Sequence, residues 1–249
     1  MSAAFQSIGP DWQTEHPVRA AMTLRTGGVS HGPYQSLNLG AHVGDEPAAV
    51  AENRRRVRES LALPSEPVWL EQVHGTAVHD VDSAALQTSL RADAAVTRSA
   101  GRVCVIQVAD CMPVLLTARD GSVVAAAHAG WRGLAGGVIE ATVSAMGVAP
   151  GRLLAWLGAT IGASNFEVGD DVRAAFVDPD SNAALAFTRN ARQRWQCDLY
   201  ALARQRLAAL GVQQVSGGGW DTHADAERFF SYRRDGQCGR MAAFIWMNP

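Results

Sequence analysis

Three short segments of this 249-residue chain carry a histidine or a cysteine where an apolar run gives way to glycine or proline. They contain His74, Cys111 and His128. Zinc fingers hold their ligands in local pairs, whereas these residues come from distant segments. Two imidazoles and one thiolate suit Zn²⁺, and three protein ligands leave a fourth position for water, as in a catalytic zinc site.

The same residues allow other interpretations. His128 could deprotonate Cys111 for nucleophilic attack on an acyl group. A cysteine in an apolar run is commonly a buried small hydrophobe, and a histidine beside glycine is commonly a hydrogen-bonded loop residue. Spacing alone leaves these alternatives open. A multicopper oxidase is disfavoured, because 7 histidines without a His-x-His pair are too few for several copper centres.

Composition excludes several classes of protein. The chain has 22 basic and 24 acidic residues and a net charge of -2, so it is not a nucleic-acid or membrane binder driven by positive charge. Every basic residue is arginine, which excludes lysine catalysis and a Gly-Lys-Ser/Thr phosphate loop. No apolar stretch is long enough for a membrane span, and residues 1–10 lack the features of a secretory signal. Four cysteines without CxxC spacing then favour reduced thiols and a cytoplasmic location.

The apolar pattern alternates strands and helices, without a repeat or a linker. We therefore expect a single domain over residues 1–249, of α/β (α+β) class, with layered mixed sheets flanked by helices. Runs at 103–109, 113–117 and 122–127 predict strands buried on both faces, with a hairpin turn at Asp120-Gly121. Further strands are predicted at 19–24, 68–73, 78–81, 153–157 and 240–247, and helices at 47–61, 134–146, 170–177 and 198–210.

Longer motifs cover nearly the whole chain in order. They are residues 23–30, 36–40, 70–75, 109–116, 127–133, 166–169, 229–236 and 239–243. With these motifs the sequence resembles the laccase-domain purine nucleoside phosphorylase family, whose members are also called polyphenol oxidases or peptidoglycan editing factors. The resemblance implies one layered α/β domain and a catalytic zinc site formed by His74, Cys111 and His128.

The resemblance also implies an activity. Family members are credited with phosphorolysis of adenosine, inosine and methylthioadenosine to base and ribose 1-phosphate, and with adenosine deamination. The expected partners are therefore a purine nucleoside and phosphate, with no nucleic acid or membrane. Two further labels are copper-dependent polyphenol oxidation and editing of cell-wall precursors. Histidine and cysteine also bind Cu²⁺, but availability in the cytosol favours zinc.

Three hypotheses follow. The first is the zinc-dependent nucleoside enzyme. The second is a cysteine hydrolase or amidase acting on cell-wall precursors, with Cys111 as nucleophile and His128 as base. The third is a metal-holding binding or regulatory protein with incidental activity.

Phosphorolysis requires cationic groups for phosphate, and arginine binds phosphate in a bidentate fork. Arg25, Arg54 and Arg132 are the candidates, because each lies beside a matching motif. Arg54 could instead lie on a solvated helix face, and Arg132 could buttress the turn after His128. Asn38 could bind ribose or base, although an asparagine in a glycine-rich loop is commonly a turn residue.

Other polar residues near these motifs could contact substrate or orient a ligand. On an extended strand Gln72 would share a face with His74 and contact substrate, while Glu71 would point away. Asp93 or Asp110 could orient a ligand histidine, as metal-bound imidazoles require, and we expect a structural role for Asp110.

The C-terminal third contains one departure from the family pattern. Asp221-Thr222 stands where family members commonly carry Cys-Thr, which puts a role for that thiol in doubt. Residues 231–236 either contact substrate or form a salt-bridged turn, and we favour the turn. No function is assigned to Cys238.

Overall fold

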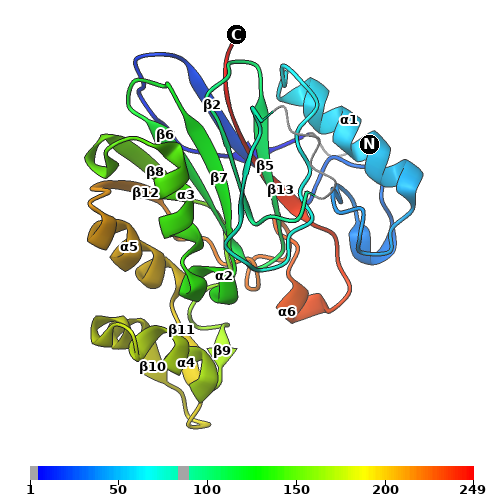
Figure 1. The fold of residues 1–249 in the computed structure, drawn as a ribbon. Helices are drawn as coiled ribbons and strands as arrows, with labels where there is room; N and C mark the ends of the chain where they lie inside the picture. Colours follow the sequence, from blue (N-terminus) through cyan, green and yellow to red (C-terminus); the bar gives the residue numbers. More distant parts are fainter. Residues whose placement is uncertain (1–4, 84–89) are drawn as a thin grey trace.

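The computed structural model describes residues 5–83 and 90–249, in which strands form three sheets (Figure 1). The six-stranded sheet contains, in order, β12 (Gln214–Gly217), β8 (Leu153–Leu157), β6 (Met112–Ala118), β7 (Val124–Ala129), β4 (Ala94–Thr97) and β3 (Val78–Asp80). The four-stranded sheet contains β1 (Ser7–Ile8), β2 (Val18–Thr23), β13 (Met241–Met247) and β5 (Val103–Val108). The small sheet contains β10 (Phe187–Arg189), β11 (Trp195–Cys197) and β9 (Glu167–Val168). The predicted class, an α/β domain with layered mixed sheets, is confirmed.

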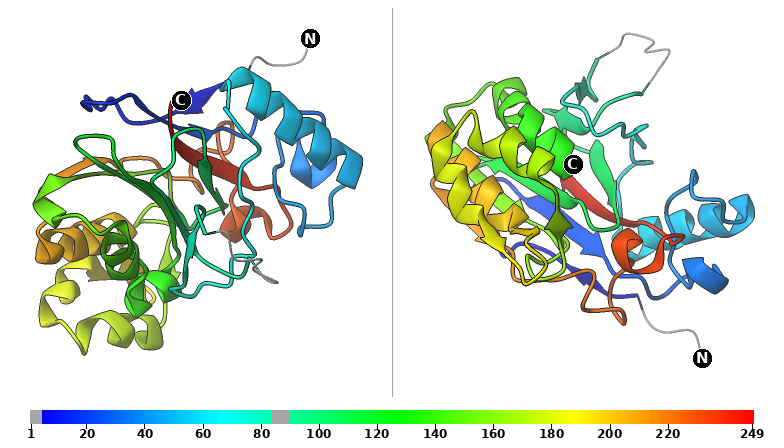
Figure 2. Two further views of the ribbon diagram at one scale, coloured as in Figure 1. Left: turned by 45° about the horizontal axis from the view of Figure 1, so that its top comes forward. Right: turned by 90° about the horizontal axis from the view of Figure 1, so that it is seen from below.

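Helices cover the outer faces of the two large sheets (Figure 2). The helices are α1 (Pro47–Ser60), α2 (Trp131–Gly136), α3 (Val138–Met146), α4 (Asp170–Val177), α5 (Leu199–Leu210) and α6 (Tyr232–Asp235), with 3-10 turns at Gly32–Tyr34, Pro150–Arg152 and Ser181–Ala186. In Figure 2, α1 lies on the side of the four-stranded sheet, and α3 and α5 lie on the opposite side of the molecule. No helix in the described ranges is long and apolar enough to span a membrane.

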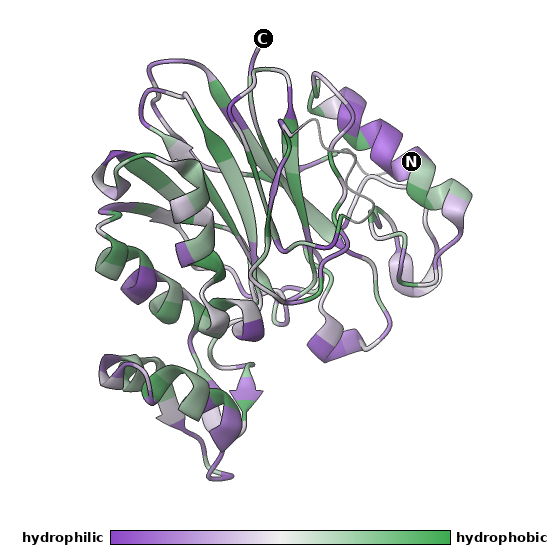
Figure 3. Cartoon of the chain, in the orientation of Figure 1, coloured by the Kyte–Doolittle hydropathy of each residue, from purple (hydrophilic) through white to green (hydrophobic). Residues whose placement is uncertain are grey.

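The core has three layers that follow from this stacking. One apolar cluster lies between the two large sheets and includes Trp156, Phe230 and Ile245. A second lies under the helices that cover the six-stranded sheet, and a third lies between the four-stranded sheet and α1. Every residue of β5, β6 and β7 is buried, as predicted for strands covered on both faces. Figure 3 shows the apolar residues gathered on these strands and the polar ones on α6 and the exposed face of α1.

Local signals account for most elements. Pro47 begins α1, where its missing N–H costs nothing, and the helix ends one residue before the predicted boundary. The predicted hairpin is present: β6 and β7 pair antiparallel, with Pro113 opposite His128 and Gly121 at φ +71° in the turn.

Two element predictions were wrong. The helix predicted at 134–146 is two helices, because Gly137 adopts a left-handed conformation at φ +99° and ends α2. Residues 68–73 do not form a strand; the segment makes only isolated bridges, at Val68 and Glu71. The alternation argument for Gln72 therefore loses its premise, although Glu71 is exposed and paired with Arg91 as expected for a residue that points away.

Candidate metal centre

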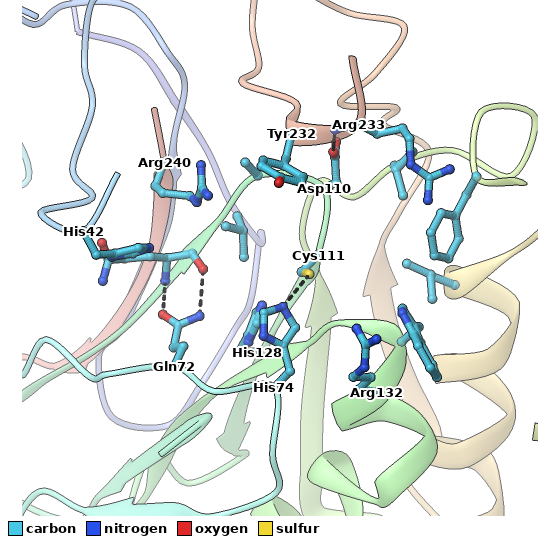
Figure 4. Close-up of a pocket in the computed structure, with 17 residues that line it drawn as sticks. His42, Gln72, His74, Asp110, Cys111, His128, Arg132, Tyr232, Arg233 and Arg240 are labelled. Atoms are coloured by element: carbon cyan, nitrogen blue, oxygen red, sulfur yellow. Dashed lines mark hydrogen bonds between the residues drawn. The ribbon is translucent and has the colours of Figure 1, made fainter. Parts of the chain in front are cut away.

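The side chains of His74, Cys111 and His128 lie together in the lining of one cavity (Figure 4). Their ligand atoms all lie within 4.8 Å of one another. His128 lies on β7, Cys111 directly precedes β6, and the pairing of these two strands brings the two side chains together. His74 lies on the loop before β3, with its Nε2 3.8 Å from Sγ of Cys111.

The spacing of these donors fits one metal ion. A sulfur and a nitrogen bound to a tetrahedral zinc lie about 3.6 Å apart, from Zn–S and Zn–N distances of about 2.3 and 2.0–2.1 Å. The observed 3.8 Å between Cys111 and His74 is close to that separation. Two imidazoles and a thiolate also have the chemistry that Zn²⁺ and copper ions prefer.

Asp93 holds the ring of His128 and the backbone around His74 in place. Its side chain is fully buried, and its Oδ1 lies 2.8 Å from Nδ1 of His128, which leaves Nε2 of that ring free for a metal. The same carboxylate accepts the backbone N–H groups of Val73, His74 and Gly75 at 3.1, 2.9 and 2.7 Å. One buried carboxylate therefore fixes both a ligand ring and the backbone that carries another ligand.

The electrostatics favour a thiolate at Cys111. Burial opposes ionisation of this thiol, but the imidazoles of His128 and His74 outweigh it and lower the pKa of Cys111. Burial likewise disfavours the charged form of His128, but Cys111 and Asp93 outweigh it and raise the pKa of this imidazole. The thiolate is the form that binds metals and attacks electrophiles.

The backbone on both sides of the site is unusual. His74 and Asp110 have φ values of +60° and +86°, in the left-handed region that non-glycine residues seldom adopt. Asp110 is held there because its two carboxylate oxygens accept Thr222 Oγ1 and the N–H of Arg233, each at 2.6 Å. These bonds agree with the structural role expected for Asp110, while Asp93 is the residue that contacts a ligand histidine.

Gly130 leaves room for the candidate metal ligands. A Cβ at this position would lie 2.7 Å from Sγ of Cys111, closer than packed atoms approach, and in a tight contact of 3.1 Å with Cδ2 of His74. The glycine two residues after His128 is therefore required by the close approach of the other two ligands.

A cavity of about 560 Å³ opens over the three candidate ligands. Its lining beyond them is His42, Gln72, Gln107, Val108, Ala109, Asp110, Trp131, Arg132, Ile161, Phe166, Leu199, Tyr232, Arg233 and Arg240. Figure 4 shows His42, Gln72 and Arg240 on one side of the ligands and Arg132 and Arg233 on the other. The lining contains three arginines, Arg132, Arg233 and Arg240, and a single carboxylate. Both oxygens of that carboxylate, Asp110, are already bonded, so the cavity favours an anion.

Arg132 is the cation best placed to bind that anion. Its guanidinium lies 4.4 Å from the centre of the Trp131 ring and makes no hydrogen bond or ion pair with any residue of 5–83 or 90–249. By contrast, Arg233 donates to the carbonyl oxygen of Glu167 and Arg240 to that of Cys238. All the donors of Arg132 therefore remain available to a ligand.

Gln72 lines the cavity, but its amide is already engaged. Nε2 donates to the carbonyl oxygen of Gln107 and Oε1 accepts the N–H of Gln107, both at 2.8 Å. Gln72 thus ties the segment that carries His74 to the edge of β5.

The other predicted substrate residues lie away from the cavity. Arg25 donates to the carbonyl oxygens of Gln35 and Ala226. Arg54 donates to the carbonyl oxygen of Leu39 and stacks on Trp69, with 3.7 Å from its guanidinium carbon to the ring centre.

Asn38 is fully buried. It donates to the carbonyl oxygen of Gly40 at 3.1 Å and accepts the N–H of Arg240 at 2.8 Å. The structure therefore brings Gln72 and Arg132 to the cavity of the candidate metal ligands and does not bring Arg25, Asn38 or Arg54 there.

Several cavity residues were not proposed from the sequence. His42, Gln107, Phe166 and Arg240 lie outside the expected site, while Arg233 belongs to residues 231–236, for which substrate contact was the alternative to a turn. Gln107 carried a usable signal, because it is the one polar residue inside the apolar run 103–109.

Residues 231–236 were expected to form a turn, and they form the short helix α6 at the cavity. Arg234 and Asp235 make the salt bridge expected of that turn, while Tyr232 lines the cavity with 61% of its surface exposed.

Asp221 has a structural explanation. Its carboxylate accepts the side-chain amide of Asn165 at 2.7 Å and the N–H groups of His223 and Ala224, and it does not line the cavity. It thereby joins the loop before Phe166 to the loop that follows β12. The carboxylate at this position acts on loop structure, outside the cavity.

Comparisons with known proteins show which family the chain resembles over nearly its whole length. Residues 19–248 match the family model described as multi-copper polyphenol oxidoreductase laccase. The chain is 51% identical over 240 residues to the purine nucleoside phosphorylase YfiH of Escherichia coli, covering 96% of this chain and 98% of the relative. It is 52% identical to a purine nucleoside phosphorylase of Pseudomonas aeruginosa, with the same two coverages. The crystal structure of Neisseria meningitidis protein NMB0706 superposes with a TM-score of 0.92 at 47% identity, covering 98% of this chain and 99% of that one.

Proposed function

The chain belongs to the family described as multi-copper polyphenol oxidoreductase laccase, and we propose that it is a zinc-dependent purine nucleoside phosphorylase. One observation carries the proposal: two imidazoles and a thiolate, within 4.8 Å of one another, lie in the wall of a cationic cavity. Two relatives that match nearly their full length are named purine nucleoside phosphorylases, which supports the same activity here. The products would be the free base and ribose 1-phosphate.

His74, Cys111 and His128 would hold the ion. When bound, zinc supplies a Lewis acid that polarises an oxygen ligand and lowers the pKa of bound water toward neutrality. Because three protein donors leave one position for such a water, we also propose hydrolytic deamination of adenosine as a second activity. Adenosine, inosine and methylthioadenosine are the proposed substrates.

Arg132 would bind phosphate. Phosphate must reach the anomeric carbon of the ribose as the purine departs, so its negative charge has to be held beside the nucleoside. The free guanidinium of Arg132 offers a bidentate fork for two phosphate oxygens. Arg233 would add positive charge on the same side of the cavity (Figure 4).

We place this reaction in the cytoplasm. Cys111 must remain reduced to act as a ligand, and Cys104, Cys111, Cys197 and Cys238 are all free thiols. A reducing compartment keeps such thiols unpaired.

One observation favours a second candidate, a cysteine hydrolase. Cys111, His128 and Asp93 have the order of a nucleophile, a base and a group that orients the base. His74 separates the two candidates, because it is a ligand in the zinc enzyme and has no role in a thiol hydrolase.

The two candidates respond oppositely to chelation. For the zinc enzyme, purified protein should contain stoichiometric zinc by elemental analysis and release base from adenosine only when phosphate is present. A chelator should abolish that release, Zn²⁺ should restore it, and His74→Ala should prevent restoration. A thiol hydrolase would ignore the chelator and the His74→Ala change but lose activity when Cys111 is alkylated.

Arg132→Ala tests the phosphate site separately. We expect it to raise KM for phosphate by about tenfold or more, the effect of one charged pair, and to leave KM for adenosine within about twofold. Zinc-loaded protein that turns over no nucleoside with phosphate present would contradict the proposed function and favour a metal-holding regulatory protein.

A further inference from the structure

We propose that Gln107 is a specificity-determining residue whose amide recognises the substituent at position six of the purine ring. This inference rests on the proposed function, because it assigns the base side of the same cavity. It names the part of the substrate that each side of the cavity binds.

Gln107 is a buried polar side chain without a partner. Only 6% of its surface is exposed, yet Oε1 has no hydrogen-bond partner among the described residues. Buried amide oxygens are nearly always bonded, because an unbonded one loses its hydration without compensation. Gln107 also lines the cavity. Its Nε2, which is unbonded among the described residues and not fully buried, is the amide atom that a bound molecule can reach, and turning the amide over brings Oε1 to that place instead.

The backbone of Gln107 is bonded to the segment that carries His74. Its backbone N–H and carbonyl are both bonded to the amide of Gln72, two residues before His74. It also precedes Cys111 by four residues, which span at most about 14 Å of extended chain. The backbone of Gln107 is therefore fixed beside the segment that carries His74, and Gln107 lines the same cavity as the three candidate ligands.

The direction of the reaction assigns the two sides of the cavity. Displacement at the anomeric carbon brings phosphate to one face of the ribose while the base leaves from the other. The unpaired guanidinium of Arg132 lies on one side of the metal ligands, and Gln72, which is bonded to Gln107, lies on the other (Figure 4). With phosphate beside Arg132, the base lies on the side of Gln107.

A neutral amide suits the base better than phosphate. Phosphate oxygens require donors, whereas a glutamine amide offers one acceptor and two donor hydrogens. By turning over, the amide of Gln107 can accept from the amino group of adenine or donate to the oxygen of hypoxanthine. One residue thus accounts for recognition of both adenosine and inosine.

The test compares substrates that differ only at position six. In 6-methylpurine riboside a methyl group occupies that position and forms no hydrogen bond. Phosphorolysis of inosine, adenosine and 6-methylpurine riboside is measured with wild-type protein and with Gln107→Met, which keeps the length of the side chain and removes its amide. Gln213→Met, in the exposed segment before β12, is the matched control. Zinc content and melting temperature are measured for each variant, and Gln107→Leu replaces Gln107→Met if that variant does not retain zinc.

We expect the preference for inosine over 6-methylpurine riboside, as a ratio of kcat/KM, to fall about tenfold in Gln107→Met and to stay constant in Gln213→Met. The preference for adenosine should fall likewise. Equal losses for all three nucleosides would overturn the inference, because they would place Gln107 against the ribose, and so would unchanged rates.

Nucleoside affinity keeps the two proposals separate. The dissociation constants of inosine and 6-methylpurine riboside are measured by calorimetry without phosphate. If wild-type protein binds inosine but releases no base with phosphate, the proposed function fails, and the ratio of affinities in Gln107→Met still decides the role of Gln107. If wild-type protein binds neither nucleoside, both proposals are overturned.

Discussion

Asp93→Asn is the substitution that most directly tests how the metal centre is held. Oδ1 of Asp93 contacts the ring of His128 and the N–H of His74, and Oδ2 accepts the N–H groups of Val73 and Gly75. An asparagine has only one acceptor atom. Whichever way its amide is turned, its NH₂ group faces two donors that the carboxylate had bonded.

The magnitude follows from that count. Two hydrogen bonds to a buried charged group are lost, at about 1.5–3 kcal/mol each, so the free energy of unfolding should fall by about 3–6 kcal/mol. Because the ring of His128 also loses its orienting partner, zinc affinity should fall about 10- to 100-fold.

Two assays separate these effects. Urea unfolding in the presence of a chelator measures the loss of stability without bound metal. Competition with a chromophoric chelator measures zinc affinity in the folded protein.

Asp82→Asn is the matched control: Asp82 accepts Thr97 Oγ1 and the N–H of Arg98, both at 2.6 Å, and contacts none of the metal ligands. It should lower stability and leave zinc affinity within about twofold, as expected for a site independent of the metal. Unchanged zinc affinity in Asp93→Asn would refute the reasoning.

Three further predictions concern the same region. Gly130→Ala should lower zinc content by pushing a methyl group against Cys111, whereas Gly151→Ala, with no atom within 4 Å of its Cβ, should retain zinc; equal zinc in both would contradict the steric argument. Iodoacetamide should alkylate Cys111 in chelator-treated protein and spare the buried Cys104, and prior addition of Zn²⁺ should protect Cys111, as read by mass spectrometry. Asp221→Ala should lower the melting temperature by several degrees, since it removes a side chain that bonds two loops, and should preserve zinc content.

The sequence predicted the central strands because the residues that specify them are neighbours in the chain. Residues 103–109, 113–117 and 122–127 are apolar on both faces, and Gly121 marks the turn between the last two. It did not predict β4 (Ala94–Thr97), whose short alanine-rich segment has no pattern of its own and is a strand because it pairs with β7 and β3. The break at Gly137 was also missed, since a glycine inside an apolar helical pattern does not by itself show its φ.

The metal ligands could be proposed from residue type and resemblance, and the cavity around them could not. Arg25 and Asn38 lie in matching motifs because they hold loops together, with donors and acceptors bonded to the backbone. A matching motif does not distinguish such a residue from one that binds substrate. Gln107 and Arg240 reach the cavity through the pairing of β5 with β13, a long-range contact that no short motif records.

The arrangement around Asp93 also bears on the arrival of the ion. Because this carboxylate holds the ring of His128 and the backbone at His74 through bonds within the protein, the site for the ion is preorganised. Little conformational entropy remains to be lost when the ion enters, so most of the attraction between ion and donors can appear as affinity. The apoprotein should accordingly take up its ion quickly and without refolding, unlike small zinc domains that acquire their shape only with the metal.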